Sequence, residues 1–204
     1  MCSSDLDRGV GILDLAAKIR AGLKLPDGAP RSLDVHLTHD VQNVATYPNG
    51  CHIVEVEIDP ETGVVEIAKY SSVNDFGVML NPLLVEGQVH GGVVQGIGQA
   101  LYESTVYDDD TGQLLSGSFM DYALPRAGDV TNIGFVSHPS PATTNMLGVK
   151  GCGEAGCAGA LPSVMNAVVN ALQDIGVDYI DMPATPHKVW QAIQAAKTGN
   201  AHAA

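Results

Sequence analysis

The sequence predicts an α+β fold with a mixed sheet, β-hairpins and packed helices. Segments that alternate like strands and segments with helical spacing do not follow one another in strict alternation, as they would in a doubly wound fold. Clusters of turn residues also separate short strand-like runs at hairpin spacing. The chain has 204 residues and is 45% hydrophobic, so it can bury a sizeable core as one large domain or two small ones.

The strands are predicted from period-two patterning. Residues 52–59 alternate apolar and acidic side chains, and residues 60–63 form a Pro-Glu-Thr-Gly turn. Residues 64–73 supply a second strand, which makes this whole segment a hairpin. A second hairpin is expected around residues 108–112, and residues 132–137 are predicted to form a further short strand.

The helices are predicted from apolar side chains that recur every three or four residues. They cover residues 12–23, 85–101, 160–175 and 186–196. Thr185 is a natural N-cap for the last of these helices, and Pro186 suits its first position.

The helix at residues 85–101 contains an unusual number of glycines: Gly87, Gly91, Gly92, Gly96 and Gly98. Each costs about 0.8–1 kcal/mol of helix propensity relative to alanine. Very close packing, against another backbone or against a ligand, would offset this cost. Gln95 lies in the same region, with an amide that can donate and accept hydrogen bonds. The spacing leaves both explanations open.

A glycine-rich segment at residues 148–159 reads Gly-Val-Lys-Gly-Cys-Gly-Glu-Ala-Gly-Cys-Ala-Gly and contains a single carboxylate, Glu154. It leads into the helix predicted at residues 160–175. A lone acid on such a loop is a candidate catalytic base. The alternative is a glycine-rich turn whose glutamate interacts with the helix dipole.

The charge of the chain and its cysteines narrow the classes of function. The net charge of −13 disfavours binding to nucleic-acid phosphates. No apolar run is long enough for a membrane span, and residues 1–8 lack a signal-peptide pattern. The four cysteines form no dense framework, so a cytoplasmic location is expected. We divide the chain into a partly disordered or incomplete segment at residues 1–44, a domain at residues 45–197 and a flexible tail at residues 198–204.

No metal site is predicted from the side chains themselves. Cys152 and Cys157 have the C-x4-C spacing of part of a plant-type iron–sulfur loop, but the further cysteines at short spacing are missing. Of the seven histidines, only His36 and His39 lie close together in the sequence, and no third ligand is evident, so a zinc site is not expected.

Four linked motifs, in order and approximate spacing, resemble the molybdenum-cofactor subunit of the xanthine dehydrogenase, aldehyde oxidase and carbon monoxide dehydrogenase family. They are Val-Asn-Asp-Phe-Gly at residues 73–77 with Leu-Asn-Pro at residues 80–82, the Gly-Gln-Val-His-Gly-Gly-Val-Val-Gln-Gly-Ile-Gly segment at residues 87–98, Gly-Ser-Phe-Met-Asp-Tyr-Ala-Leu-Pro-Arg at residues 117–126, and Lys-Gly-Cys-Gly-Glu-Ala-Gly at residues 150–156. The resemblance covers roughly residues 45–197, within the C-terminal part of that subunit. The family's earlier motifs are absent, so the chain resembles a fragment of the second molybdopterin-binding domain.

The resemblance implies a molybdenum-dependent oxidoreductase that hydroxylates an aldehyde, an N-heterocycle or carbon monoxide. It implies a molybdenum–molybdopterin cofactor, in the cytosine dinucleotide form. By motif match, Glu154 is the catalytic base. The expected cofactor-binding residues are Gln95, Gly96, Gly92, Lys150, Gly151 and Gly153.

The resemblance also implies partners. These are the missing N-terminal part of the molybdenum subunit, subunits or domains that carry FAD and a 2Fe–2S cluster, and a small-molecule substrate. The chain is expected to be inactive by itself, because half of the cofactor cradle is missing. A different hypothesis is a non-catalytic α+β module that binds a partner chain and uses its glycines for packing.

Overall fold

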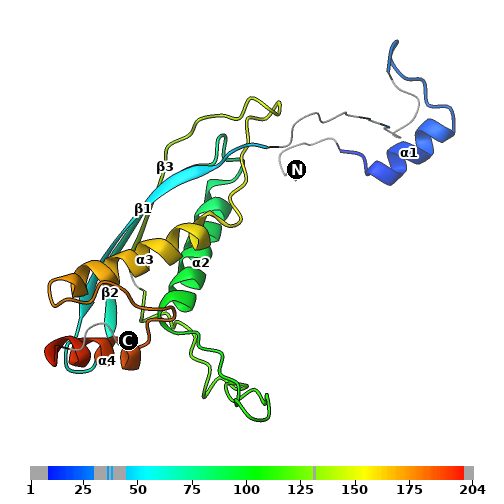
Figure 1. Cartoon of the computed structure of the whole chain (residues 1–204). Coiled ribbons are helices and arrows are strands. Elements are labelled where there is room, and N and C mark those ends of the chain that lie inside the picture. Colours follow the sequence, from blue (N-terminus) through cyan, green and yellow to red (C-terminus); the bar gives the residue numbers. More distant parts are fainter. Residues whose placement is uncertain (1–8, 30–35, 37, 39–44, 131, 200–204) are drawn as a thin grey trace. The chain divides into compact units, whose positions relative to one another are not determined.

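The computed structural model describes residues 9–29, 36, 38, 45–130 and 132–199. The chain divides into two compact units, residues 1–42 and residues 43–204 (Figure 1). In the first unit, helix α1 (Ile12–Arg20) begins at the predicted residue, and none of its side chains is buried. The predictions about residues 1–8, His39 and residues 200–204 lie outside the described part of the chain.

A mixed three-stranded sheet lies in the described part of the second unit, in the order β1-β2-β3. Strand β1 (Asn49–Ile58) pairs antiparallel with β2 (Val65–Asp75), so the predicted hairpin is confirmed. Strand β3 (Ile133–Ser137) runs parallel to β2 on its other side. The second predicted hairpin is reduced to one antiparallel bridge between Tyr107 and Leu114. The α+β class with a mixed sheet is therefore confirmed.

The described residues of this unit form the helices α2 (Pro82–Leu101), α3 (Ala155–Gln173) and α4 (Pro186–Lys197). In Figure 1, α3 lies along β1 and crosses α2. Thr185 caps α4 as predicted: its hydroxyl accepts a hydrogen bond from the Lys188 N–H at 3.5 Å. The expectation that no apolar segment has the length of a membrane span is wrong by this criterion, because α3 could cross a membrane by length and composition alone. One face of this helix, which includes Val164, Val168 and Leu172, is buried in the core of the described structure.

The glycines at the α2–α3 contact allow the two backbones to approach closely. A Cβ added to Gly96 would lie 2.6 Å from the Cβ of Ala160, and one added to Gly92 would lie 3.0 Å from the backbone N of Cys157. From the other side, a Cβ added to Gly156 would lie 2.8 Å from the backbone N of Val93. Helix packing therefore accounts for these three glycines.

Helix α3 begins at Ala155, whereas the sequence predicted a start at Ala160. The prediction was wrong by more than a turn, because it placed Gly156 and Gly159 in the glycine-rich loop before the helix. Gly156 is buried against α2, and Gly159 lies against the ring of His52. Tertiary packing therefore holds these weak helix formers in helical geometry.

The carboxylate of Asp75, at the end of β2, joins three further segments of the chain. Its Oδ1 accepts hydrogen bonds from the N–H groups of Gly77 at 2.9 Å and Ser140 at 2.8 Å. Its Oδ2 lies 2.5 Å from Lys150 Nζ and accepts a hydrogen bond from Asn49 Nδ2 at 3.3 Å. The Asp75 and Lys150 side chains are each 8% exposed.

The pKa of the Asp75 carboxyl lies well below its ordinary value. Burial by itself raises this pKa, but the hydrogen bond from Lys150, the two backbone N–H donors and the nearby positive charge together outweigh the effect of burial. The carboxylate therefore stays ionised and keeps its partners throughout the neutral range.

Adding one methyl group to Gly156 should destabilise the chain. Because the new Cβ meets the backbone of α2, the helices must separate, and we expect Gly156→Ala to lower the free energy of unfolding by about 1–3 kcal/mol. Gly91→Ala is the matched control, since its Cβ would have no neighbour within 4 Å. It should raise stability by about 0.5–1 kcal/mol through helix propensity. Urea unfolding of both variants measures the difference, and equal effects would contradict close helix packing.

Removing the charge of Asp75 should produce a pH-dependent loss of stability. Near pH 7, Asp75→Asn should cost about 3–5 kcal/mol, because it leaves the buried ammonium of Lys150 unpaired. A carboxyl whose pKa is lowered by folding stabilises the chain above its unfolded-state pKa of about 3.9, and this stabilisation is lost as the pH falls toward the folded-state value. The wild-type and variant free energies of unfolding should therefore converge below about pH 4. Curves that stay parallel down to pH 2 would contradict this assignment.

Candidate functional site

Glu154 lies at the end of a short loop that is held at both ends. The loop starts at Lys150, whose backbone N–H donates to the Phe76 carbonyl at 2.9 Å and whose ammonium pairs with Asp75. It ends at Glu154, the N-cap residue of α3, whose side chain makes no capping hydrogen bond. The Glu154 side chain is exposed. A carboxylate without a capping partner on a fixed backbone can accept a proton from a bound molecule.

The middle of the loop is held from α2. Gln88 Nε2 donates a hydrogen bond to the carbonyl of Gly153 at 2.8 Å, next to Glu154 in the chain. Sequence reasoning missed Gln88 and selected Gln95 instead. Helical spacing could have identified Gln88, because it is seven residues from Gln95 and therefore lies on the same face of α2.

Exposed glycines surround this hydrogen bond. On α2 they are Gly87 and Gly91, and on the loop they are Gly151 and Gly153. A Cβ added to any of the four would have no neighbour within 4 Å, so the packing of the described residues does not require glycine at these positions. We call these four glycines, together with Gln88 and Gln95, the open glycine face. It offers bare backbone and amide groups beside Glu154, which suits close approach by a flat ligand.

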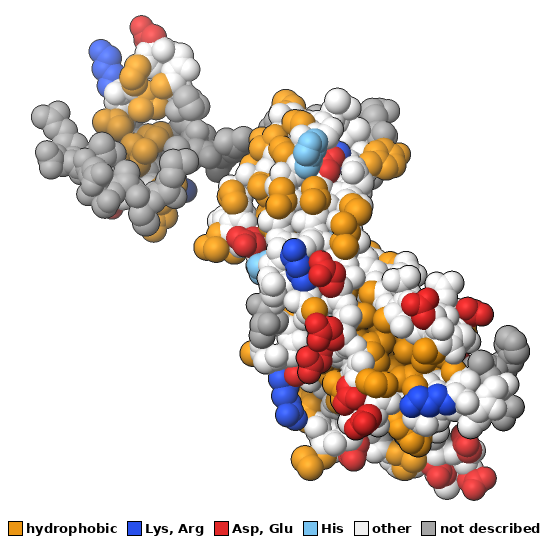
Figure 2. Space-filling view, turned by 90° about the vertical axis from the view of Figure 1, so that its left-hand side faces the viewer, with side chains coloured by type: hydrophobic (Ala, Val, Ile, Leu, Met, Phe, Trp, Pro, Cys, Tyr) orange, Lys and Arg blue, Asp and Glu red, His pale blue; other side chains and the backbone are white. Residues whose placement is uncertain are grey.

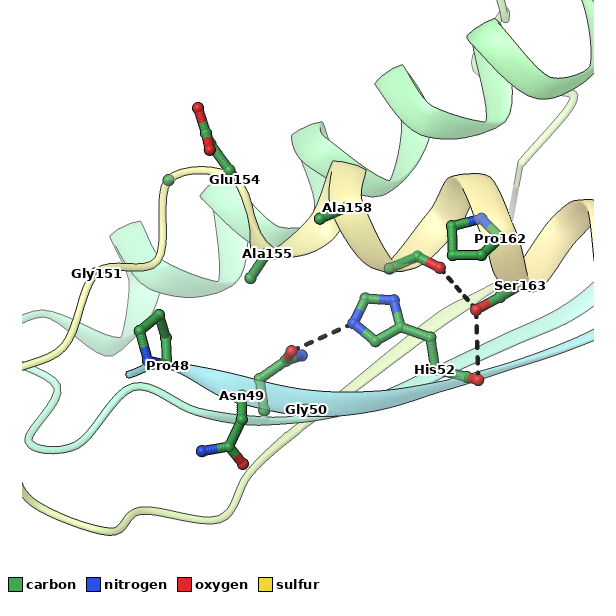
Figure 3. A pocket seen from close by; sticks show the side chains of 13 residues that line it. Pro48, Asn49, Gly50, His52, Gly151, Glu154, Ala155, Ala158, Pro162 and Ser163 are labelled. Atoms are coloured by element: carbon green, nitrogen blue, oxygen red, sulfur yellow. Dashed lines mark hydrogen bonds between the residues drawn. The ribbon is translucent and has the colours of Figure 1, made fainter. Parts of the chain in front are cut away.

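A cavity of about 670 Å³ lies between the start of β1 and the first turns of α3, and the loop residues Gly151, Gly153 and Glu154 also border it. His52 lies on its β1 side, and Ala155, Ala158 and Pro162 line its α3 side (Figure 3). Glu154 belongs to the rim of the cavity, but its carboxylate points away from His52 and Asn49 (Figure 3). The carboxylate therefore points away from the interior of the cavity, whereas Gly151 and Gly153 border both the cavity and the open glycine face.

Hydrogen bonds fix the ring of His52 in this cavity. Its Nδ1 lies 2.6 Å from the hydroxyl of Tyr70, and its Nε2 lies 3.2 Å from Asn74 Oδ1. Tyr70 is fully buried, and burial raises the pKa of its phenol above the ordinary value, so it remains protonated and can donate. Asn74 Nδ2 is buried without a hydrogen-bond partner in the described structure. With both ring nitrogens engaged, His52 is a fixed part of the wall.

The predicted cofactor-binding residues fall into two groups. Gly151, Gly153 and Gln95 are exposed on the open glycine face, and their assignment stays a prediction. Gly92 and Gly96 are buried in the α2–α3 contact, and the ammonium of Lys150 is paired with Asp75. These last three residues have structural contacts that account for them without a cofactor.

The described residues contain no group of three or more histidine, cysteine or acidic side chains that could hold a metal ion. Cys51, Cys152 and Cys157 are free thiols. Acidic side chains extend through the middle of the surface in Figure 2, with few basic ones among them. This face therefore has no basic track of the kind that binds nucleic-acid phosphates.

Comparison with known proteins identifies the family. A family model described as a molybdopterin cofactor-binding domain matches residues 21–131, more than half of the chain. This match begins at residue 21, whereas the resemblance in sequence motifs begins at residue 45. The nicotine 6-hydroxylase large subunit of Paenarthrobacter nicotinovorans is 41% identical over 185 residues, which cover 90% of this chain and 22% of that protein. The carbon monoxide dehydrogenase large chain of Hydrogenophaga pseudoflava is 32% identical over 169 residues, which cover 83% of this chain and 21% of that protein.

Solved structures agree in fold. Quinoline 2-oxidoreductase from Pseudomonas putida 86 matches with a TM-score of 0.77 and 36% identity, over 83% of this chain and 21% of that one. The Cu,Mo-containing carbon monoxide dehydrogenase matches with a TM-score of 0.70 and 31% identity, over 75% of this chain and 19% of that one. The chain thus spans about a fifth of the length of these relatives. It belongs to the molybdopterin cofactor-binding family of the xanthine dehydrogenase and carbon monoxide dehydrogenase large subunits.

Proposed function

We propose that this chain is the part of a molybdenum hydroxylase large subunit that carries the catalytic base, Glu154, and one side of the cofactor cradle. The observation that carries the proposal is the open glycine face. Gly87 and Gly91 together cost about 2 kcal/mol of helix propensity and are not required by packing, so a bound group that needs bare backbone explains them.

The residues of this face suit a molybdopterin group. The amides of Gln88 and Gln95 can donate and accept hydrogen bonds at the edge of a pterin ring, and Gly151 and Gly153 leave the loop backbone uncovered. When bound, the group supplies the redox chemistry of hydroxylation. We propose the cytosine dinucleotide form of the cofactor. We leave Gly92 and Gly96 out of the proposed contacts, because they are buried against α3.

The role of Glu154 is to hold and move one proton. Its carboxylate is exposed toward the side where the cofactor and the substrate would meet, and it makes no capping bond that would have to break first. The backbone held by Gln88 and Lys150 fixes where this base stands. A base held in reach of the reacting group contributes typically about 10²–10⁴-fold to the rate.

We propose an N-heterocycle as the substrate class. The nicotine hydroxylase and quinoline oxidoreductase relatives share 41% and 36% identity with this chain, compared with 31–33% for the carbon monoxide dehydrogenases. Aldehydes and carbon monoxide are the other substrates that an assay should include.

We further propose that the working enzyme is a cytoplasmic assembly in which the rest of the large subunit covers this chain, with FAD and a 2Fe–2S cluster on partner subunits. Apolar side chains of the described unit are left bare, among them Phe119 at 83%, Met120 at 93% and Met146 at 97% exposure. Such side chains are typical of surfaces that another chain or domain covers.

Glu154→Gln in the assembled enzyme should keep the fold and the bound cofactor but lose most of the turnover. The substitution is nearly isosteric, yet an amide cannot accept the proton, so the rate should fall at least about 10²-fold. The measurement is the rate of metal-centre reduction by substrate at matched molybdenum content. A rate close to wild type would show that the base lies elsewhere and would favour a structural turn.

Gln95→Ala should lower cofactor retention more than fold stability. The side chain is exposed, and a helix position tolerates alanine well, so the melting temperature should hardly change. Molybdenum content per subunit, compared with that of the exposed control Gln99→Ala on the same helix, measures the effect. Full molybdenum content together with a large drop in melting temperature would indicate a packing role.

A further inference from the structure

The loop that carries Glu154 cannot hold its own shape. Two of its residues, Gly151 and Gly153, are exposed glycines with no neighbour around the Cβ position, and glycine has the greatest backbone freedom of any residue. Between residues 151 and 154, the only side-chain hydrogen bond in the described structure is the one from Gln88 to the Gly153 carbonyl. The position of Glu154 therefore depends on how firmly the two ends of the loop are held.

The α3 end is held by helix packing through Gly156, and the other end is held by a network centred on Lys150. The backbone N–H of Lys150 donates to Phe76, and Asn145 bonds both the N–H and the carbonyl of Val149, at 3.1 and 3.0 Å. Gly77 and Gly148 both have positive φ where these two segments meet. The ammonium of Lys150 pairs with the carboxylate of Asp75. This carboxylate also accepts hydrogen bonds from the Asn49 side chain and from the backbone N–H groups of Gly77 and Ser140.

A buried ion pair is a poor way to obtain stability alone. Removing two charges from water is costly, and well-packed apolar side chains of similar size often serve equally well. In some proteins a buried pair instead specifies geometry, because an ammonium that left its carboxylate would stay buried and unpaired at a high cost. Here the carboxylate accepts hydrogen bonds from four residues, and Lys150 stands directly before the first glycine of the Glu154 loop.

We propose that Asp75 and Lys150 are the positioning residues of Glu154, and that their ion pair sets where the catalytic base stands rather than contacting the cofactor. This inference rests on the proposed function of Glu154. It predicts that breaking the pair slows turnover while substrate and cofactor still bind, because a displacement of the base by about 1 Å can cost on the order of 10²-fold in rate.

The test uses Lys150→Met and the double variant Asp75→Asn/Lys150→Met in the complete, cofactor-loaded enzyme. We expect kcat per bound molybdenum to fall about 10–10²-fold, with KM and molybdenum content unchanged. Val168→Ala is the matched control. It removes a buried core side chain in the second half of α3, away from the loop, so it should lower the melting temperature without changing kcat per molybdenum. If Lys150→Met does not fold, the double variant, which leaves no unpaired charge, replaces it, and kcat per molybdenum, KM and molybdenum content are measured on that variant.

A second readout needs no cofactor. In the 204-residue chain, amide hydrogen exchange over residues 148–156 should become faster in Lys150→Met than in wild type, whereas Val168→Ala should leave that peptide close to wild type. Unchanged exchange, kcat per molybdenum within twofold of wild type, or a loss of molybdenum at unchanged kcat would each overturn the positioning role.

Glu154→Gln, measured in parallel, separates the two claims. Full activity of Glu154→Gln would refute the proposed function itself. An inactive Glu154→Gln enzyme beside a fully active Lys150→Met enzyme would refute only the positioning role.

Discussion

The structure of the second unit depends on how closely helices α2 and α3 approach. Gly92 and Gly96 on one helix and Gly156 on the other bring the two backbones together where any side chain would force them apart. This contact places the N-terminus of α3, and with it Glu154, beside the exposed face of α2. Val164 and Val168 of α3 are buried in the same core, and α3 also lies against β1. One steric constraint therefore joins the core to the candidate site.

Two kinds of glycine have different physical causes in this chain. Between the helices, glycines are required because atoms of the facing helix occupy the space that a Cβ would need. Those on the open glycine face have no neighbour within the described structure, although Gly87 and Gly91 weaken the helix that contains them. The sequence shows only a helix with many glycines. The structure separates the glycines that packing explains from those that a ligand would explain.

Much of the fold follows from local patterns in the sequence. The alternation of residues 52–59 and the turn before Gly63 specify the hairpin, and Thr185 with Pro186 specifies the start of α4. The start of α3 could not be predicted, because Gly156 and Gly159 become helical only through contacts with α2 and β1. Glu154 could be singled out as the lone acid of its loop. The partner of Lys150 could not, because Asp75 is distant in the sequence and a charged residue at a strand end has many possible partners.

We propose that the open glycine face and Glu154, rather than the interior of the cavity beside His52, receive the molybdenum cofactor. Anomalous scattering at the molybdenum edge from crystals of the assembled enzyme tests this claim most directly. The account predicts a molybdenum peak on the side of the loop toward which the Glu154 carboxylate points, next to Gln88 and Gly153. A peak inside the cavity lined by His52 and Pro162, or one remote from this loop, would contradict it.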